Sequence, residues 1–177
     1  MFFYASYQRH LKKITYFCIE IMRQPPLLPV IIGTGFGAGF WPWGPGTAGS
    51  ILATAIWYGM SFTFSQTLLI GITAVCIVVF TALGTWATKR LQPFWGEDPS
   101  RVVVDEMVGV WTPLLLAVNW WTALLSLVLF RFFDILKPLG IRALDRRQGA
   151  FWVMADDLLA GVYSAFVLLI IRLLAHG

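Results

Sequence analysis

Residues 130–138 read FRFFDILKP, a stretch with the composition of a membrane helix but with charges that such a helix rarely carries. Arg131, Asp134 and Lys137 recur at steps of three residues among aromatic and aliphatic neighbours. On an α-helix such steps drift by about 60°, so the three charges share one face within about 120°. Ionisable groups at membrane depth are costly and usually face a functional interior. The stretch therefore predicts a membrane helix with one charged, functional face.

The composition of the whole chain also indicates a membrane protein. Of the 177 residues, 58% are hydrophobic and only 12% are charged, whereas a soluble domain has about 25% charged residues. The net charge of +4 is too small to indicate nucleic-acid binding. We therefore expect an all-α, multi-pass helical membrane protein that contacts membrane lipids, with no nucleic-acid partner and no evident obligate protein partner.

The chain divides into a short N-terminal segment and one larger domain. Residues 1–25 alternate apolar and basic positions at helical period, which predicts an amphipathic basic helix. Such a helix suits a membrane surface or packs on the protein's own loops. Pro25 and Pro26 end it. Residues 26–177 contain no internal repeat or linker and are expected to form a single helical membrane domain.

Apolar runs define the helices of this domain. Residues 47–64 and 67–87 predict a helical hairpin, because roughly 20 apolar residues span a bilayer. Residues 107–118 and 121–133 are each too short to cross alone. They form either one long kinked span or a re-entrant hairpin held inside the protein. A last apolar helix is predicted over residues 158–174.

Acidic residues are concentrated in one part of the chain. Eight of the nine lie between residues 97 and 157. Two adjacent pairs, Asp105–Glu106 and Asp156–Asp157, begin apolar segments. A single acid at such a place caps free backbone N–H groups, but adjacent acids at low dielectric repel one another unless a cation intervenes. Carboxylate oxygens are the ligands that Mg²⁺ prefers, so the set favours a magnesium site.

Two further motifs suit a phosphate. Arg131 and Lys137 flank Asp134; they are an ordinary ion pair with a lysine reaching the interface, or a phosphate clamp beside a metal ion. In PWGPGTAGS (residues 42–50), Thr47 or Ser50 can cap a helix whose free N–H groups attract an anion. The same motif is equally typical of a plain helix–turn junction.

The topology decides whether these motifs meet. If residues 107–133 are re-entrant, both charged segments lie on one side of the membrane, and their Lys and Arg residues make that side cytoplasmic. If residues 107–133 cross the bilayer, the acids are split between two sides and no single site forms.

These motifs resemble the phosphatidylglycerophosphatase A family of bacterial lipid phosphatases. The resemblance covers about residues 30–172 and rests on PWGPGTAGS (42–50), DPSRVVVDEMVG (98–109), FRFFDILKP (130–138) and DDLLAG (156–161). It implies a Mg²⁺-dependent hydrolase that converts phosphatidylglycerophosphate to phosphatidylglycerol at the bacterial inner membrane. The sequence departs from the family at Ala150 and Trp152, where the family tends to have glycines.

The expected chemistry is direct attack by a metal-activated water. His10 and His176, the only histidines, lie at the chain ends, which excludes a histidine nucleophile on placement. A lipid-headgroup transferase and a cation transporter are the rival functions; the charges cluster at segment boundaries, which disfavours the transporter. The residues expected to bind Mg²⁺ and act in catalysis are Asp105, Glu106, Asp134, Asp156 and Asp157, and those expected to bind substrate are Arg131, Lys137, Thr47 and Ser50.

Overall fold

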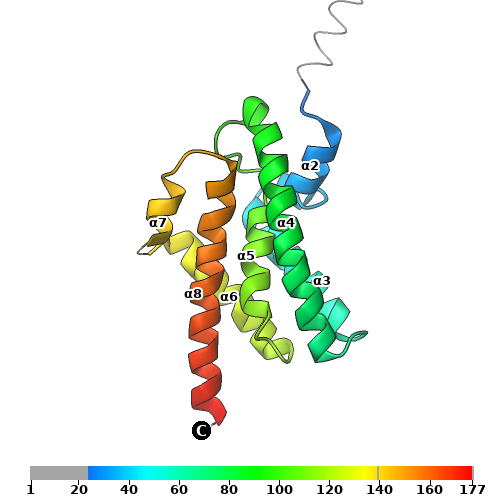
Figure 1. Cartoon of the computed structure of the whole chain (residues 1–177), viewed down its shortest axis with the longest axis vertical. Coiled ribbons are helices and arrows are strands. Elements are labelled where there is room, and N and C mark those ends of the chain that lie inside the picture. The colour runs from blue at the N-terminus through cyan, green and yellow to red at the C-terminus, as the bar shows by residue number, and fades with distance from the viewer. Residues whose placement is uncertain (1–23, 139, 177) are drawn as a thin grey trace, which may run out of the picture.

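The computed structural model describes residues 24–138 and 140–176, and every regular element within them is helical (Figure 1). The described residues contain no strand, so the prediction of an all-α fold is confirmed. The amphipathic helix predicted over residues 1–25 lies outside the described residues, except for its last two positions. The elements are α2 (Leu27–Gly33), η1 (Ala38–Phe40), α3 (Pro45–Ser61), α4 (Gln66–Trp95), α5 (Val104–Leu114), α6 (Trp120–Leu136), α7 (Gly140–Asp145) and α8 (Ala150–His176).

Two helices, α4 and α8, are long and apolar enough to cross a membrane. Only 17% and 22% of their apolar windows are buried within the chain, whereas the core helix of a soluble protein would be mostly buried. Val78 on α4 and Phe166 on α8, for example, are 70% and 64% exposed. Apolar surfaces of this extent are rare on soluble monomers. These helices therefore fit a membrane protein.

The predicted hairpin over residues 47–64 and 67–87 corresponds to α3 and α4. Pro45 occupies the first turn of α3, where its fixed φ suits a helix and its missing N–H costs nothing. The turn at residues 62–65 leads into α4, which continues beyond the predicted residue 87 to Trp95. Gly96, with φ +98°, ends α4 in a conformation that favours glycine.

Residues 107–133 form a helical hairpin and not one long kinked span. Helices α5 and α6 run in opposite directions and pack against each other (Figure 1). A capping box begins α6, because the Asn119 side chain accepts a hydrogen bond from the Thr122 backbone N–H at 2.9 Å. Both open ends of the hairpin, at Asp105 and Lys137, line the same cleft.

The turn of this hairpin is held by side chains from two neighbouring helices. Gln66 at the start of α4 donates to the carbonyl oxygen of Ala117 at 2.7 Å. Arg172 near the end of α8 donates to the carbonyl oxygen of Leu116 at 2.5 Å. Backbone carbonyl groups at a turn lack helical partners and need other donors, and these two bonds satisfy the carbonyl groups of Leu116 and Ala117.

Helix α8 begins at Ala150, eight residues before the predicted start at residue 158. Residues 150–157, which include the two aspartates, therefore form the first two turns of the helix. As a result, Asp156 and Asp157 lie inside α8 and not at its beginning, which corrects the prediction that they open the last helix.

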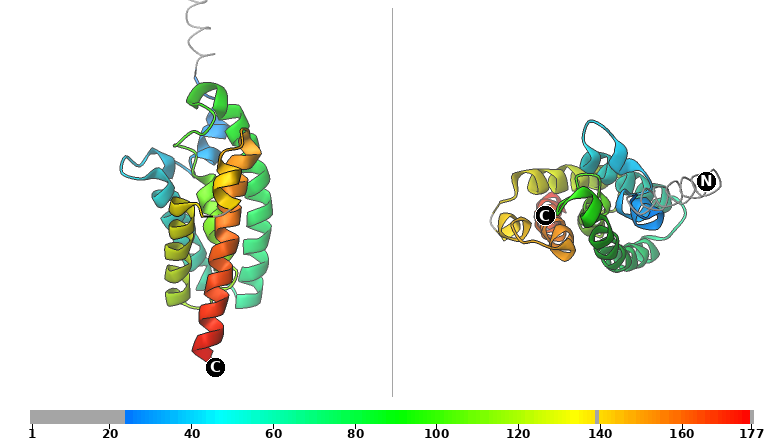
Figure 2. Two further views of the ribbon diagram at one scale, coloured as in Figure 1. Left: turned by 90° about the vertical axis from the view of Figure 1, so that its left-hand side faces the viewer. Right: turned by 90° about the horizontal axis from the view of Figure 1, so that it is seen from above.

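Helix α5 is the centre of the bundle. It packs against α3, α4, α6 and α8, as the view from above shows (Figure 2). Its residues Met107, Val108, Val110 and Leu114 are fully or almost fully buried. Because α5 carries Asp105 and Glu106 in its first turn, this packing fixes two acidic side chains in the interior of the protein.

Candidate active site

A cleft of about 370 Å³ opens among the first turns of α3, α5 and α8, the end of α6, the end of α7 and the segment that follows α4. All eight acidic residues between 97 and 157 line it, so the acids that are dispersed in the sequence converge in space. Four cations, Arg131, Lys137, Arg146 and Arg147, line it as well. The acids of the lining are Glu97, Asp98, Asp105, Glu106, Asp134, Asp145, Asp156 and Asp157.

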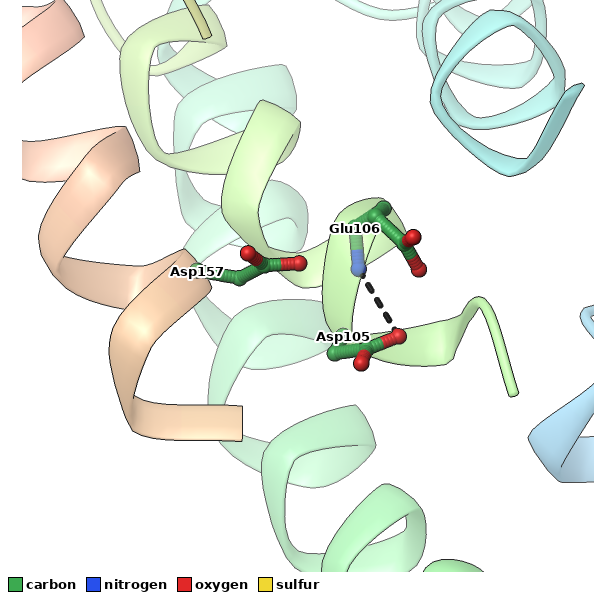
Figure 3. Close-up of side chains that lie close together, drawn as sticks. All are labelled: Asp105, Glu106 and Asp157. Carbon is green, nitrogen blue, oxygen red and sulfur yellow. Dashed lines mark hydrogen bonds between the residues drawn. The ribbon is translucent and has the colours of Figure 1, made fainter. Parts of the chain in front are cut away.

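Three carboxylates form a cluster within this cleft. Asp105 and Glu106 come from the first turn of α5, and Asp157 points toward them from α8 (Figure 3). One oxygen of each side chain lies within 4.8 Å of the others, a spacing at which one metal ion could bind all three. The backbone N–H of Glu106 donates to Oδ1 of Asp105 at 3.1 Å, which orients that carboxylate.

Helix capping does not explain the acids on α8. Neither Asp156 nor Asp157 lies in the first turn, where acids interact favourably with the helix dipole. Both are buried, at 5% and 4% exposure. Buried carboxylates are kept in proteins where they are paired or coordinate a metal ion, so their position favours a role in the site.

The electrostatics of the cluster favour a bound cation. Burial raises the pKa of Asp105 well above its ordinary value, and the neighbouring Glu106 raises it further. Burial also raises the pKa of Glu106; a hydrogen bond with Asp105 and the charge of Arg131 lower it, and Asp134 raises it. Among the described residues, Oε2 of Glu106 and Oδ1 of Asp156 are buried without a hydrogen-bond partner. An oxygen-only site with unpartnered acceptors fits a hard divalent ion such as Mg²⁺.

Asp134 and Arg131 form an ion pair beside the cluster. Nη1 of Arg131 lies 2.5 Å from Oδ2 of Asp134. Nε of Arg131 is buried and has no partner among the described groups, so this donor remains for a ligand. Asp134, a predicted metal ligand, is thus paired with a cation and lies outside the three-carboxylate group.

Lys137 connects three elements of the cleft. It follows α6 in a left-handed conformation, with φ 44°, and pairs with Asp145 at the end of α7 and with Asp156 on α8 at 2.9 Å. Burial lowers its pKa, but the hydrogen bonds to these two carboxylates outweigh burial and raise it. Lys137, predicted to bind phosphate, is therefore held between two acids. Asp156, a predicted metal ligand, is paired with this lysine and lies outside the three-carboxylate group.

The start of α3 and the glycine that precedes it also line the cleft. Gly44, Pro45 and Gly46 line it, whereas Thr47 and Ser50, both predicted to bind substrate, do not. Ser50 is buried and donates to the carbonyl oxygen of Gly46 at 2.9 Å, and Thr47 is exposed. The predicted PWGPGTAGS motif thus borders the cleft through Gly44, Pro45 and Gly46, and not through its two hydroxyl side chains.

Gly46, in the first turn of α3, lies directly against the charged groups of the cleft. A Cβ there would overlap Oε1 of Glu106 and approach Nη1 of Arg131 to 3.2 Å. Glycine at this position therefore allows α3 to begin directly against the charged groups.

Sequence reasoning missed two cations of the cleft, Arg146 and Arg147. Their only signal was membership of a basic segment, which indicates membrane side and not a binding role. The guanidinium carbon of Arg147 lies 4.3 Å from the ring centroid of Trp152, an arrangement that only the folded turn before α8 creates.

The sequence is similar to a known protein family and to named relatives. The family model described as Phosphatidylglycerophosphatase A matches residues 31–172. Proteins named phosphatidylglycerophosphatase A from Escherichia coli and Haemophilus influenzae are 36% and 33% identical over 145 and 146 residues. These alignments cover 78% and 80% of this chain, and 80% and 87% of the respective relatives.

A third relative carries a different name. A Bacteroides thetaiotaomicron protein, named provisionally as a phosphatidylinositol-3-phosphatase, is 51% identical over 155 residues, 85% of this chain and 98% of its own length. No solved structure matches the chain. The family match covers most of the residues and includes every acid of the cleft. The chain therefore belongs to the phosphatidylglycerophosphatase A family and is a phosphoric monoester hydrolase.

Proposed function

We propose that this protein hydrolyses the terminal phosphomonoester of phosphatidylglycerophosphate in a Mg²⁺-dependent reaction, giving phosphatidylglycerol and inorganic phosphate. The observation that carries the proposal is the convergence of Asp105, Glu106 and Asp157 in a cleft that also contains Arg131. Carboxylates beside an arginine suit a metal ion and a phosphate bound next to each other. The names of two relatives support this substrate.

Asp105, Glu106 and Asp157 would hold the metal ion. Their oxygen donors suit Mg²⁺, and the unpartnered Oε2 of Glu106 is an acceptor without another role among the described residues. When bound, Mg²⁺ supplies positive charge next to the phosphate and lowers the pKa of a water molecule.

The protein's own groups bind and orient the phosphate. Arg131 offers its buried Nε to a phosphoryl oxygen, and its ion pair with Asp134 fixes the plane of the guanidinium group. In the hydrolysis, water attacks phosphorus, the bond from phosphorus to the glycerol oxygen breaks, and one proton of the water ends on that oxygen, which gives the alcohol and inorganic phosphate. Negative charge gathers on the phosphoryl oxygens, and a fixed guanidinium stabilises it because no reorganisation is needed.

The ion pair of Lys137 with Asp156 stabilises the arrangement of the helices around the cleft. Through Asp145 and Asp156, Lys137 joins the segment after α6 to α7 and α8. Asp156 precedes Asp157 on α8, so the same pairing fixes the turn of helix that carries the third carboxylate of the cluster.

The setting we propose is the inner membrane of a bacterium, with the cleft on the cytoplasmic side. The headgroup of a phospholipid lies just outside the hydrocarbon, and the cleft lies at the ends of apolar helices. Membrane lipids would then surround the exposed apolar faces of α4 and α8.

A second candidate substrate is phosphatidylinositol 3-phosphate. The name of the Bacteroides thetaiotaomicron relative, which is 51% identical to this chain, favours it. It also presents a phosphomonoester on a polar headgroup, so the same cleft chemistry would serve both lipids.

The test is phosphate release by the purified protein from each of the two lipids in mixed micelles, with Mg²⁺ or with EDTA. We expect release that requires Mg²⁺ and is faster with phosphatidylglycerophosphate. Asp157→Asn should lower the rate by at least about a hundredfold, the order found when a positioned catalytic group is lost.

Glu97→Gln is the matched control, because Glu97 is an exposed acid at the rim of the cleft. It should retain a rate close to that of the wild type. Folded wild-type protein that releases no phosphate from either lipid would contradict the proposed activity, and faster release from the inositol lipid would replace the proposed substrate.

A further inference from the structure

Among the residues that the structure describes, two of the four cations in the cleft pair with carboxylates. Arg131 pairs with Asp134, and Lys137 pairs with Asp145 and Asp156. Arg146 and Arg147 form no salt bridge with any described residue, although acids line the same cleft. An anion brought by the substrate can therefore bind one of these two arginines without breaking an existing pair.

Of these two arginines, Arg147 contacts an aromatic ring. Its guanidinium carbon lies 4.3 Å from the ring centroid of Trp152, within the range of a cation–π interaction. Stacking on the ring covers one face of the guanidinium but leaves its N–H edges free, and those edges match two phosphate oxygens. Since the plane is already fixed, less side-chain entropy is lost on binding.

The local backbone supports this stack. Gly149, with φ +115°, makes the sharp turn that brings Arg147 back toward the first turn of α8. The backbone N–H of Trp152 donates to the carbonyl oxygen of Gly149 at 2.9 Å. This bond holds the backbone of Trp152, from which the indole ring extends. The N-terminal end of α8 also carries partial positive charge.

The cleft thus has an inner and an outer part of different chemistry. Asp105 and Asp157 are buried at 7% and 4% exposure, beside the partly buried Arg131, whereas Arg147 is exposed at the rim. We propose that Arg147, stacked on Trp152, binds the phosphodiester that joins the substrate's headgroup to its diacylglycerol. This inference rests on the proposed function, in which the terminal phosphomonoester occupies the inner part.

The role makes Arg147 a specificity determinant. Phosphatidylglycerophosphate and phosphatidylinositol 3-phosphate both contain a phosphodiester besides the phosphomonoester. Phosphatidate carries its phosphomonoester directly on diacylglycerol and has no diester. A cation at the rim therefore favours the first two lipids over phosphatidate, and it does so without touching the bond that breaks.

The experiment compares kcat/KM for phosphatidylglycerophosphate and for phosphatidate in mixed micelles. Arg147→Ala should lower the value for phosphatidylglycerophosphate by about tenfold to a hundredfold, the range for a hydrogen bond to a charged group. It should leave the value for phosphatidate within about twofold of the wild type. Arg147→Lys, which keeps the charge but loses the planar fork, should fall between the wild type and Arg147→Ala.

Arg90→Ala is the matched control, because Arg90 is exposed near the end of α4 and does not line the cleft. It removes the same charge and should change neither value. An equal fall for both lipids with Arg147→Ala would overturn the inference, because it would indicate a general effect on folding or on the phosphomonoester. Unchanged values for both lipids would overturn it as well.

A binding measurement separates this inference from the proposed hydrolysis. Glycerophosphoglycerol contains the phosphodiester but neither the phosphomonoester nor acyl chains, so calorimetric titration into detergent-solubilised protein needs no catalysis. Wild type should bind it about tenfold or more tightly than Arg147→Ala does. Equal affinity, or no binding to wild type, would overturn the role of Arg147 even in an active enzyme. Binding that depends on Arg147 in an inactive protein would support the subsite and contradict only the hydrolysis.

Discussion

Asp105 carries a cost in stability that its position in the cluster explains. The side chain is 7% exposed, one of its oxygens lies within 4.8 Å of oxygens of Glu106 and Asp157, and burial together with Glu106 raises its pKa. A carboxyl whose pKa is higher in the folded state than in the unfolded state destabilises the fold once the pH exceeds the unfolded value, about 4. A destabilising residue of this kind is retained in proteins where activity requires it.

We predict that Asp105→Asn stabilises the metal-free protein while abolishing phosphate release. The amide keeps the Oδ1 acceptor for the Glu106 N–H but removes the negative charge. The free energy of unfolding in EDTA at pH 8 should rise by about 1 kcal/mol or more, since one pKa unit corresponds to about 1.4 kcal/mol. Denaturant unfolding in detergent measures it.

The pH dependence provides the internal control for this prediction. The gain should be small near pH 4, where the unfolded carboxyl only begins to ionise, should grow as the pH rises from there toward the raised folded-state pKa, and should level off above it. Saturating Mg²⁺ should reduce the gain, because the ion stabilises only the protein with all three carboxylates. A variant less stable than the wild type in EDTA at every pH would contradict the predicted repulsion.

At the scale of helices, the close crossing of α5 and α8 sets the geometry of the carboxylate cluster. A Cβ on Gly161 of α8 would overlap the carbonyl oxygen of Gly109 on α5 and lie 2.8 Å from Cβ of Thr112. A Cβ on Gly109 would lie 2.9 Å from the carbonyl oxygen of Asp157. Small residues let helix backbones approach closely in membranes. Here the approach places the carboxylates of the two helices within reach of one ion.

We predict that Gly161→Ala separates α5 from α8 and thereby impairs the site. Overpacking of this kind costs about 1–3 kcal/mol, and the displaced Asp157 should lower phosphate release by about tenfold or more, since small misplacements of catalytic groups are costly. Thermal unfolding and phosphate release on the same preparation measure the two effects.

Gly71→Ala on α4 is the control for that substitution, because a Cβ at Gly71 meets no atom within 4 Å. It should leave activity unchanged and raise stability slightly, by about 0.5–1 kcal/mol, through the higher helix propensity of alanine. Equal activity of the two variants would show that the crossing distance does not limit catalysis.

At the scale of the molecule, the sequence predicted the helical class and the segments of the site, because helical period and charge position are local properties. It left residues 107–133 open between a kinked span and a hairpin, since the bonds from Gln66 and Arg172 to the hairpin turn are long-range. The start of α8 was also missed. An apolar run counted from the C-terminal side stops at the charged Asp157, whereas the helix itself begins at Ala150. Arg147 could not be identified, because its contact with Trp152 depends on the conformation of Gly149.

The whole molecule is asymmetric in charge, and this asymmetry predicts its orientation in a membrane. Lys89 and Arg90 belong to the last two turns of α4, and Arg101 lies in the segment between α4 and α5, which also lines the cleft with its four cations. Arg172 belongs to the last turns of α8. Figure 1 shows the C-terminal ends of α4 and α8 at opposite ends of the molecule. Lysine and arginine accumulate on the cytoplasmic side of membrane proteins. The cleft should therefore face the cytoplasm, and the turn between α3 and α4 should face the other side.

Two single-cysteine variants test this orientation in a background with Cys18→Ser and Cys76→Ser. Gln148→Cys places a thiol at the rim of the cleft and Ser65→Cys places one in the turn before α4; both positions are exposed. We expect a membrane-impermeant maleimide to label Ser65→Cys in cells with an intact inner membrane, and to label Gln148→Cys only after that membrane is opened. Phosphate release by both variants verifies the fold. The opposite labelling pattern would place the cleft outside the cytoplasm, and labelling of both thiols in intact cells would mean that the two ends of the α3–α4 hairpin are not separated by the bilayer.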